Sequence, residues 1–409
     1  MRQEKLSYSR EVSKASPTYF TALDGFRGVL AIMIAIYHTM WSSHLNNSQF
    51  WENGPALVDL FFVFSGFLMF TLYDGQINSR TEARAFIKRR FARIYPLHFF
   101  MLIVALLYAV ARLVAHFVGL AVYEPGEILP FQAGASDTLW SFFTNLTLIH
   151  SMGVHDALTY NMPSWTVSVE FYTYFVFAAM MIWARPKKAW HFALLALAVG
   201  VNYYALSRVK PNIDFHYDLG FFRCLGGFFT GVVVAYAYRN IKPLYERVKA
   251  RAHVQTFTFW ASVLEAVVLA ILVGFILYGS GKAQFFLAPV AFVFVLGFAF
   301  DMGLISKFLG LGLFRYVAKI SYSIYMVHIL FSLVFAIFIE STMPSITGPS
   351  WDTSQFAGDA FLIPYLACVL VFSHLSYHYI EMPGRKALNA YDFTSKWQRL
   401  LSLGKARQT

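Results

Sequence analysis

The sequence predicts an all-α polytopic membrane protein, on three observations. Of the 409 residues, 58% are hydrophobic and only 13% are charged, which is too apolar for an ordinary soluble domain. Several predominantly apolar stretches, such as ASVLEAVVLAILVGFILY, approach the length of roughly 20 residues that a helix needs to cross a bilayer. The basic residues fall mainly in the short segments between these stretches.

Ten transmembrane helices are expected from the apolar stretches. Their approximate ranges are 22–41, 56–73, 95–116, 165–184, 190–206, 219–238, 257–279, 284–301, 320–340 and 358–380. We take 22–385 as one transmembrane domain, between a cytoplasmic N-terminal segment, 1–21, and a short basic cytoplasmic tail, 386–409. The apolar segment 139–152 is too short to cross and is expected to be an interfacial or re-entrant piece on the outer side.

The distribution of basic residues predicts the orientation. With the N-terminus in the cytoplasm, 27 of the 33 Lys and Arg residues fall in cytoplasmic segments, and only Arg208, Lys210 and Lys282 fall in outer loops. Cytoplasmic loops of membrane proteins carry an excess of Lys and Arg. The split predicts that both termini lie in the cytoplasm. It also explains the net charge of +11 without nucleic acid as a partner.

The first expected span carries an arginine and a histidine. Arg27 and His38 are eleven residues apart, about three helical turns, so they share one face at a separation of about 16 Å along the axis. Ionisable groups inside a bilayer are costly and are therefore functional candidates. Arg27 would hold the charged head of an anionic substrate, and His38 would be the general base, since histidine titrates near neutral pH. A snorkelling Arg27 and a structural His38 are the alternatives.

Two acidic residues inside spans are expected near the same site. Glu170 lies in the fourth span, and Asp59 lies near the outer end of the second. Either carboxylate could orient His38 and stabilise its imidazolium, as a carboxylate does for a catalytic histidine. Each could equally pair with a cation inside a span, Arg112 or Arg223.

Further candidates carry weaker signals. Ser65 and Gly66 form a small-residue pair, where either a thin ligand or a neighbouring helix could approach closely. His328 is a second imidazole inside a span and ranks below His38. No metal is expected, because the sequence shows no cluster of His and carboxylate residues with ligand spacing.

Six basic residues gather immediately before the third span. They are Arg80, Arg84, Lys88, Arg89, Arg90 and Arg93. Retention of this segment in the cytoplasm explains a few positive charges. A polyanionic ligand at the membrane surface would explain their density.

Seven stretches together resemble the acyltransferase-3 family of membrane O-acyltransferases. In chain order they are LDGFRGVLAIMIAIYH, LFFVFSGFLMF, RRFARIYPLHFF, SWTVSVEFYTYFVFA, GFFRCLGGFFTGVVVAY, ISYSIYMVHILF and YHYIEMPGRK. They follow the order of the family and cover roughly residues 20 to 386, nearly the whole chain. Because the chain ends soon after the last span, it resembles members without a C-terminal SGNH hydrolase-like domain.

The resemblance implies roles for particular residues. Arg27 and His38 match the basic residue and the histidine of the family's first helix, and Arg90 and Arg93 match an Arg-x-x-Arg motif linked to the acyl-CoA donor. Guanidinium groups bind phosphate oxygens in a bidentate manner, which suits the phosphates of CoA. Arg89, beside this motif, is expected to contribute to the same site.

Two other family positions are matched, one of them with a departure. Ser65 and Gly66 correspond to the serine-glycine pair of the second helix, and Glu170 corresponds to the glutamate of the fourth. The family often has a second acidic residue or Gln after this glutamate, whereas this chain has Phe171. The departure argues against a mechanism with two adjacent carboxylates.

The expected function is therefore that of an O-acyltransferase of the bacterial inner membrane. The resemblance implies transfer of an acyl group, acetyl by expectation, from cytoplasmic acyl-CoA to a hydroxyl of an extracytoplasmic glycan or glycolipid. The expected partners are acyl-CoA, this acceptor and the bilayer, and the oligomeric state stays open. The alternatives are a secondary transporter or flippase of a glycan or acyl-lipid, although no internal repeat supports a transporter, and a non-catalytic partner in polysaccharide export.

Overall fold

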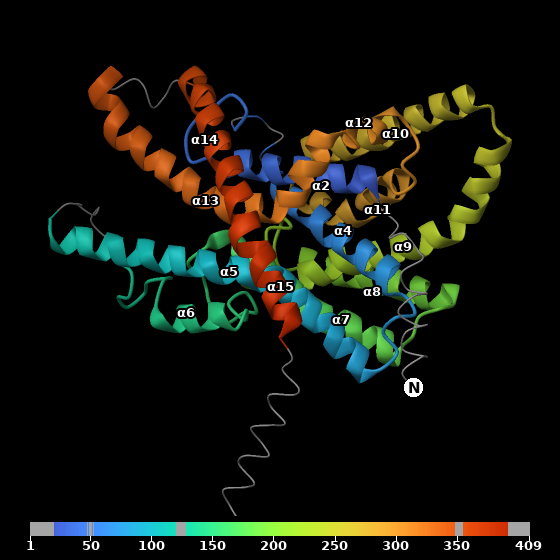
Figure 1. The fold of residues 1–409 in the computed structure, drawn as a ribbon, viewed down its shortest axis with the longest axis horizontal. Helices are drawn as coiled ribbons and strands as arrows, with labels where there is room; N and C mark the ends of the chain where they lie inside the picture. The colour runs from blue at the N-terminus through green and yellow to red at the C-terminus, as the bar shows by residue number, and fades with distance from the viewer. Residues whose placement is uncertain are drawn as a thin grey trace, which may run out of the picture.

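A computed structural model of the chain describes residues 20–46, 48, 51, 53–119, 128–347 and 355–391, and their regular secondary structure is all helical (Figure 1). For residues 341–347 it describes the backbone only. Most of the expected N-terminal segment 1–21 and tail 386–409 lies outside these residues.

The helices follow one another without strands in the described ranges. In chain order they are α2 (Thr21–Tyr37), α4 (Pro55–Tyr73), α5 (Arg80–Phe117), α6 (Leu139–Leu146), η1 (Met162–Ser164), α7 (Trp165–Trp183), α8 (Ala189–Ser207), α9 (Gly220–Arg251), α10 (Val254–Tyr278), η2 (Gly281–Phe286), α11 (Leu287–Phe298), α12 (Leu304–Leu309), α13 (Gly312–Thr347), α14 (Gln355–Ser376), a π-helical turn η3 (Tyr377–Glu381) and α15 (Met382–Ala390).

Each of the ten expected spans corresponds to a helix. Within the described part of the chain, nine helices are long and apolar enough to cross a membrane. The tenth, α2, has 17 residues, or about 26 Å. The expected class, an all-α polytopic membrane protein, is therefore confirmed.

Several helices run beyond their apolar stretches. The third expected span, 95–116, is part of the 38-residue helix α5, which begins fifteen residues earlier. Ser79 caps α5 by accepting a hydrogen bond from the backbone N–H of Glu82, as N-cap residues do. All six clustered basic residues, which precede the expected span, therefore lie on the same helix as the span. Arg and Lys are good helix formers, so the helix continues where the apolar pattern stops.

Two pairs of helices pack with unusually close backbones. In the α4–α9 pair, a Cβ atom at Gly66 would lie 1.8 Å from the carbonyl oxygen of Phe228, and one at Gly231 would lie 2.0 Å from that of Val63. In the α2–α13 pair, a Cβ atom at Gly28 would lie 2.8 Å from the backbone nitrogen of Ala318. Small residues permit such approaches between membrane helices, so Gly66 serves packing.

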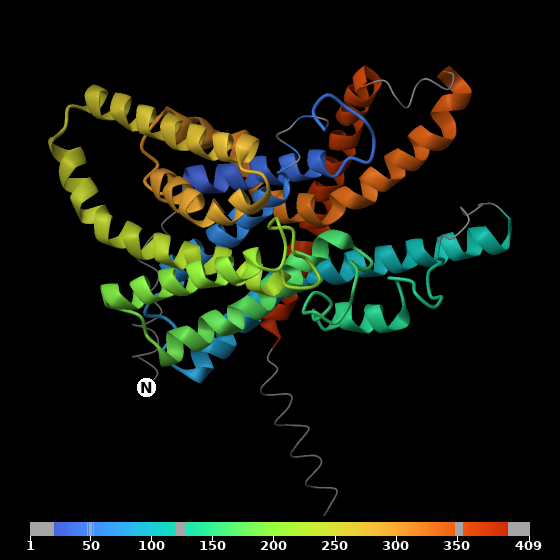
Figure 2. The ribbon, with the colours of Figure 1, turned by 180° about the vertical axis from the view of Figure 1, so that it is seen from behind.

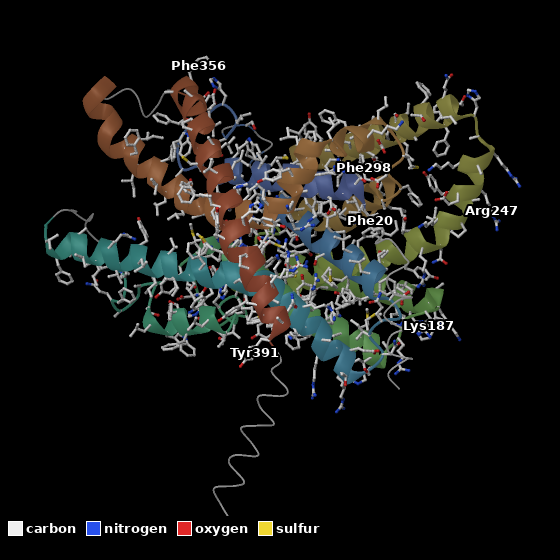
Figure 3. The ribbon with its side chains drawn as sticks, in the orientation of Figure 1. Phe20, Lys187, Arg247, Phe298, Phe356 and Tyr391 are labelled. Carbon is white, nitrogen blue, oxygen red and sulfur yellow. The ribbon has the colours of Figure 1, made fainter. Side chains whose placement is uncertain are left out.

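The connections between helices gather at opposite ends of the molecule. In Figures 1 and 2, α13 and α14 diverge at one end, and α9 and α10 join at the other. Lys187 and Arg247, expected in cytoplasmic segments, lie at the end where α9 and α10 join, whereas Phe356, expected on the outer side, lies at the other (Figure 3). The labelled residues of the two sets of loops thus lie at different ends of the molecule, and the orientation in the membrane stays a prediction.

The segment expected at the interface, 139–152, contains the two-turn helix α6. Its exposed face is apolar, with Leu139 66% and Trp140 61% exposed, while Thr144 and Asn145 are buried against the protein. His98 on α5 contacts this helix through Nε2, 3.0 Å from the Asn145 carbonyl oxygen. An apolar outer face suits a helix lying in the membrane interface.

Candidate active site

Two cavities lie between the helices and approach each other near the middle of the molecule. One has a volume of about 260 Å³ and contains Arg27, and the other has a volume of about 410 Å³ and contains His38. We call them the Arg27 cavity and the His38 cavity. Val58 on α4 and Tyr325 on α13 line both, so these two side chains stand where one cavity gives way to the other.

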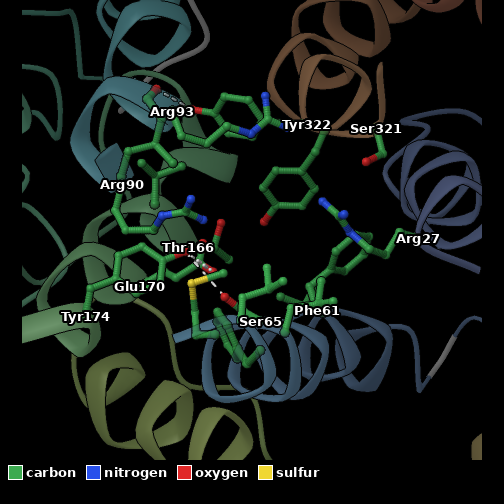
Figure 4. A pocket seen from close by; sticks show the side chains of 18 residues that line it. Arg27, Phe61, Ser65, Arg90, Arg93, Thr166, Glu170, Tyr174, Ser321 and Tyr322 are labelled. Carbon is green, nitrogen blue, oxygen red and sulfur yellow. Dashed lines mark hydrogen bonds between the residues drawn. The ribbon is translucent and has the colours of Figure 1, made fainter. Parts of the chain in front are cut away.

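The Arg27 cavity collects guanidinium groups from two helices. Arg27 enters from α2, while Arg90 and Arg93 enter from α5 on the opposite side (Figure 4). The spacing of three residues places Arg90 and Arg93 on one face of α5. Such convergence of planar cations suits phosphate or carboxylate oxygens.

The basic residues of α5 have different surroundings. The Nε atom of Arg90 is buried and has no hydrogen-bond partner among the described residues. Arg93 forms an ion pair with Glu381, which is fully buried. Arg89 is exposed and does not line the cavity; its Nε donates to the Tyr73 hydroxyl at 3.3 Å. Lys88 donates to carbonyl oxygens at the end of α15, at 2.9 and 2.6 Å.

The candidate residues Glu170 and Ser65 also line the Arg27 cavity. The Tyr174 hydroxyl donates to Glu170 Oε1 at 2.7 Å and lies 3.3 Å from Ser65 Oγ. Glu170 lines the Arg27 cavity, whereas His38 lines the His38 cavity. The geometry therefore gives no direct support to Glu170 as the carboxylate that orients His38.

The His38 cavity combines aromatic and ionisable side chains. His38 follows the last residue of α2. The loop between α8 and α9 contributes Asp214 and His216, which form an ion pair at 2.9 Å. The His216 ring contacts Trp165 edge to face, at 4.9 Å between ring centroids. Burial raises the pKa of Asp214, but the hydrogen bond from His216 and nearby cations outweigh it and hold the pKa below its usual range.

The ring of His38 is held by α2 and α13. Its Nδ1 lies 2.9 Å from the carbonyl oxygen of Ile34 and 3.2 Å from Nε2 of His328. His328 is fully buried, and its Nδ1 lies 2.7 Å from the Tyr325 carbonyl oxygen. His328, ranked below His38 from the sequence, therefore lies within hydrogen-bonding distance of His38.

The carboxylate of Asp59 forms an ion pair with Arg223. Both of its carboxylate oxygens accept hydrogen bonds from Arg223, at 2.7 to 3.1 Å, and both side chains are fully buried. Arg223 also donates to the carbonyl oxygens of Phe215 and Pro55 and stacks over Trp165 at 5.2 Å. Of the two alternatives for Asp59, the structure favours pairing with Arg223 over contact with His38.

The sequence-based reasoning missed several residues that line these cavities or pair with a residue that does. They are Glu381, Tyr322 and Tyr325, together with Asp214 and His216 of the α8–α9 loop. The sequence held one signal for the tyrosines, because Tyr322, Tyr325 and His328 recur at intervals of three residues and share a face of α13. Glu381 follows the motif YHYI but pairs with an arginine 288 positions away, which no local pattern indicates.

No metal ligand set is seen at either cavity. Within the described residues, no three His, Cys, Asp or Glu side chains are grouped so that they could hold an ion.

Comparison with curated proteins yields remote relatives over most of the chain. It is 22% identical to the peptidoglycan O-acetyltransferase OatA of Listeria monocytogenes, over 92% of this chain and 57% of that protein. It is 21% identical to the O-acetyltransferase OatA of Staphylococcus aureus, over 93% of this chain and 60% of that protein. It is 29% identical to protein 2 in the picA locus of Rhizobium radiobacter, over 46% of this chain and 94% of that protein.

The chain spans about three fifths of the length of the OatA proteins that it matches. No solved structure matches it. The family profile described as "Acyltransferase domain" matches residues 20–378, which include both cavities and the helices from α2 to α14 that correspond to the expected spans. The chain therefore belongs to the acyltransferase-3 family.

Proposed function

We propose that this protein is a membrane O-acetyltransferase that moves an acetyl group from cytoplasmic acyl-CoA to a hydroxyl of an extracytoplasmic glycan or glycolipid. We place it in the bacterial inner membrane with both termini in the cytoplasm. Its family and the O-acetyltransferase names of its relatives support the reaction class, and the charge distribution supports the orientation.

The observation that carries the proposal is the meeting of two chemically different cavities at Val58 and Tyr325. An acyl donor in the cytoplasm and an acceptor outside must bring reacting atoms together inside the membrane. Arg27 lies in the N-terminal half of α2 and His38 directly follows its last residue, about 16 Å apart by helical rise. An extended pantetheine arm can cover that distance, with the CoA phosphates at one end and the thioester at the other.

The acyl donor would enter the Arg27 cavity. Arg90 presents guanidinium N–H groups to the CoA phosphates. Arg27 and Arg93 add the N–H groups that their ion pairs with Asp24 and Glu381 leave free. A guanidinium has five N–H donors, so one ion pair does not exhaust Arg93. The unpartnered Nε of Arg90 favours this residue as the first contact, since buried polar groups are normally satisfied.

The reaction would take place at His38. The acceptor oxygen attacks the thioester carbonyl carbon, and its proton passes to His38 Nε2. The tetrahedral intermediate then collapses, the C–S bond breaks, and the proton returns from His38 to the departing thiolate. The products are an O-acetyl ester and CoA, so atoms and protons balance.

The acceptor would occupy the outer part of the His38 cavity. Trp165 offers an aromatic surface, while Asp214 and His216 offer acceptor and donor groups at the cavity wall. Few well-placed polar groups beside apolar walls are typical of small-ligand sites. These groups suit a sugar ring with hydroxyls, which supports a glycan acceptor.

Acetyl transfer by the purified full-length protein tests the proposal. Protein in lipid vesicles receives labelled acetyl-CoA and a mixture of cell-wall and lipopolysaccharide glycans, and mass spectrometry measures CoA release and glycan acetylation. We expect both products from the wild type and neither from His38→Ala. A wild type that binds the glycans but neither releases CoA nor acetylates them would overturn the proposal in favour of a transporter.

Cysteine labelling in intact cells tests the orientation independently. In a Cys368→Ser background, Lys282→Cys should react with a membrane-impermeant reagent and Arg84→Cys should not. The opposite pattern would place the Arg27 cavity outside, where acyl-CoA is not supplied.

A further inference from the structure

His328 faces His38 from a fully buried position on α13, and no carboxylate contacts His38 among the described residues. A catalytic histidine commonly relies on a carboxylate to hold its ring and stabilise its charge. The two carboxylates predicted for that role lie elsewhere, Asp59 with Arg223 and Glu170 with Tyr174. The role must therefore be filled by another group, and this inference rests on the function proposed above.

The hydrogen-bond partners of the two rings determine which nitrogen of each ring carries a proton. A carbonyl oxygen only accepts, so the 2.7 Å contact with the Tyr325 carbonyl requires N–H at Nδ1 of His328. Likewise, the 2.9 Å contact with the Ile34 carbonyl requires N–H at Nδ1 of His38. A buried, unpaired imidazolium is costly, so the neutral form of His328 carries its lone pair on Nε2.

That lone pair meets the Nδ1–H group of His38 at 3.2 Å. His38 Nδ1–H is thus shared between the Ile34 carbonyl and His328, and Nε2 of His38 is left without a proton. Nε2 is the atom that can accept the proton of a hydroxyl in the His38 cavity. When it does so, His328 faces the resulting imidazolium with a neutral acceptor.

We propose that His328 is a positioning residue that holds the Nδ1 proton of His38, keeps its Nε2 unprotonated and stabilises its imidazolium, in place of a carboxylate. The surrounding backbone supports the geometry. Ser332 donates to the His38 carbonyl at 2.6 Å, and Tyr365 donates to the Ala35 carbonyl at 2.8 Å. These bonds fix the end of α2 against α13 and α14.

Two amide variants separate the contacts of His328. The amide of Gln reaches the position of Nε2, so His328→Gln keeps an acceptor for His38 and loses the bond to Tyr325. The amide of Asn reaches only the position of Nδ1, so His328→Asn keeps the hydrogen bond to Tyr325 and loses the contact with His38. We expect kcat to fall by about 10- to 100-fold in His328→Asn and clearly less in His328→Gln.

The full-length variants are compared in acetyl transfer, with kcat and KM measured for acetyl-CoA and for the acceptor. Both KM values should stay within about threefold of wild type, because His328 contacts neither substrate; acetyl-CoA binding by calorimetry shows that each variant is folded. Wild-type kcat in His328→Asn, or an equal or larger loss in His328→Gln, would overturn the inference. Absence of transfer in the wild type would instead refute the proposed function.

Discussion

The two cavities differ in how completely the protein satisfies their polar groups. In the Arg27 cavity, Arg90 keeps a buried Nε without a partner, and its guanidinium faces open space. In the His38 cavity, the Nδ1 side of His38 is fully engaged and only Nε2 remains available. The first arrangement suits binding of a charged group, because the ligand completes the hydrogen bonds. The second suits proton transfer, because one atom alone is left to react.

The ion pair of Asp59 and Arg223 differs from both arrangements, because its two charges are buried and paired with each other. Both groups are as deeply buried as any in the molecule, and Arg223 also donates to two carbonyl oxygens. A buried charge inside a membrane protein is a functional candidate by default. Here, however, full mutual satisfaction indicates a structural role in joining α4 to α9. The number of hydrogen bonds left open, and not burial, therefore separates the charges that we propose to bind substrate from this buried pair.

The largest effect is expected from loss of the reacting atom. His38→Ala should lower acetyl transfer by about 10²–10⁴-fold, the usual contribution of a general base. Acetyl-CoA binding should persist, because the guanidinium groups lie in the other cavity. Calorimetry and a transfer assay on the same protein measure the two effects. If acetyl-CoA binding disappears together with transfer, donor binding and catalysis are not separated between the two cavities as we propose.

The second effect is on stability. Asp59→Ala should lower the free energy of unfolding by about 3–5 kcal/mol, because it leaves a buried, uncompensated guanidinium. The double variant Asp59→Leu with Arg223→Met should recover most of the loss, since it removes both charges. Thermal unfolding in detergent measures both. If Asp59→Ala is stable but inactive, Asp59 belongs to the catalytic site after all.

The third effect is on the affinity for the acyl donor. Arg90→Ala should weaken acetyl-CoA binding by about 10- to 150-fold, equivalent to the 1.5–3 kcal/mol of a hydrogen bond to a charged group. Arg90→Lys should restore little, because lysine lacks the planar fork.

Its neighbour provides the matched control. Arg89→Ala removes the same charge from the same turn of α5, but Arg89 is exposed and outside the cavity lining. Binding in Arg89→Ala should stay within about threefold of wild type, as a surface charge contributes little. Equal losses in the two variants would mean that the cluster acts through its total charge and not through the cavity.

The smallest effect is expected where the cavities meet. Val58→Phe narrows the space beside Tyr325 where the two cavities meet. Transfer should fall by about 10-fold, because the thioester is misplaced, whereas the affinity for acetyl-CoA should change little. Val58→Ala should keep transfer at the wild-type level or above it. Steady-state kinetics and calorimetry separate the two quantities. Unchanged transfer in Val58→Phe would show that the acyl arm takes another route.

Local patterns in the sequence predicted the helices well. Apolar stretches located ten spans, and each is helical in the structure, because the bilayer requires a continuous apolar helix at each crossing. The ends of the helices were predicted less well. The helices α5, α9 and α13 continue into charged segments, where helix propensity and not hydropathy sets the end.

Candidate residues could be selected from the sequence, but their partners could not. The cost of burying charge selected Arg27, His38, Asp59, Glu170 and Arg223, and all of them line a cavity or form the buried pair beside one. Which carboxylate meets which cation depends on contacts between residues far apart in sequence, such as Arg93 with Glu381 and Asp59 with Arg223.

The sequence by itself therefore determined the fold class and the positions of the helices, and it selected the ionisable residues as candidates, since each depends on composition along a short segment. The tertiary structure alone decided that α2 packs beside α13 in the register that brings His328 to His38 across 290 positions. It also decided that Glu170 and His38 face different cavities. These outcomes depend on which faces of the helices pack together. An apolar helix can pack any of its faces against lipid or other apolar helices, so its own sequence does not specify the neighbour of each face.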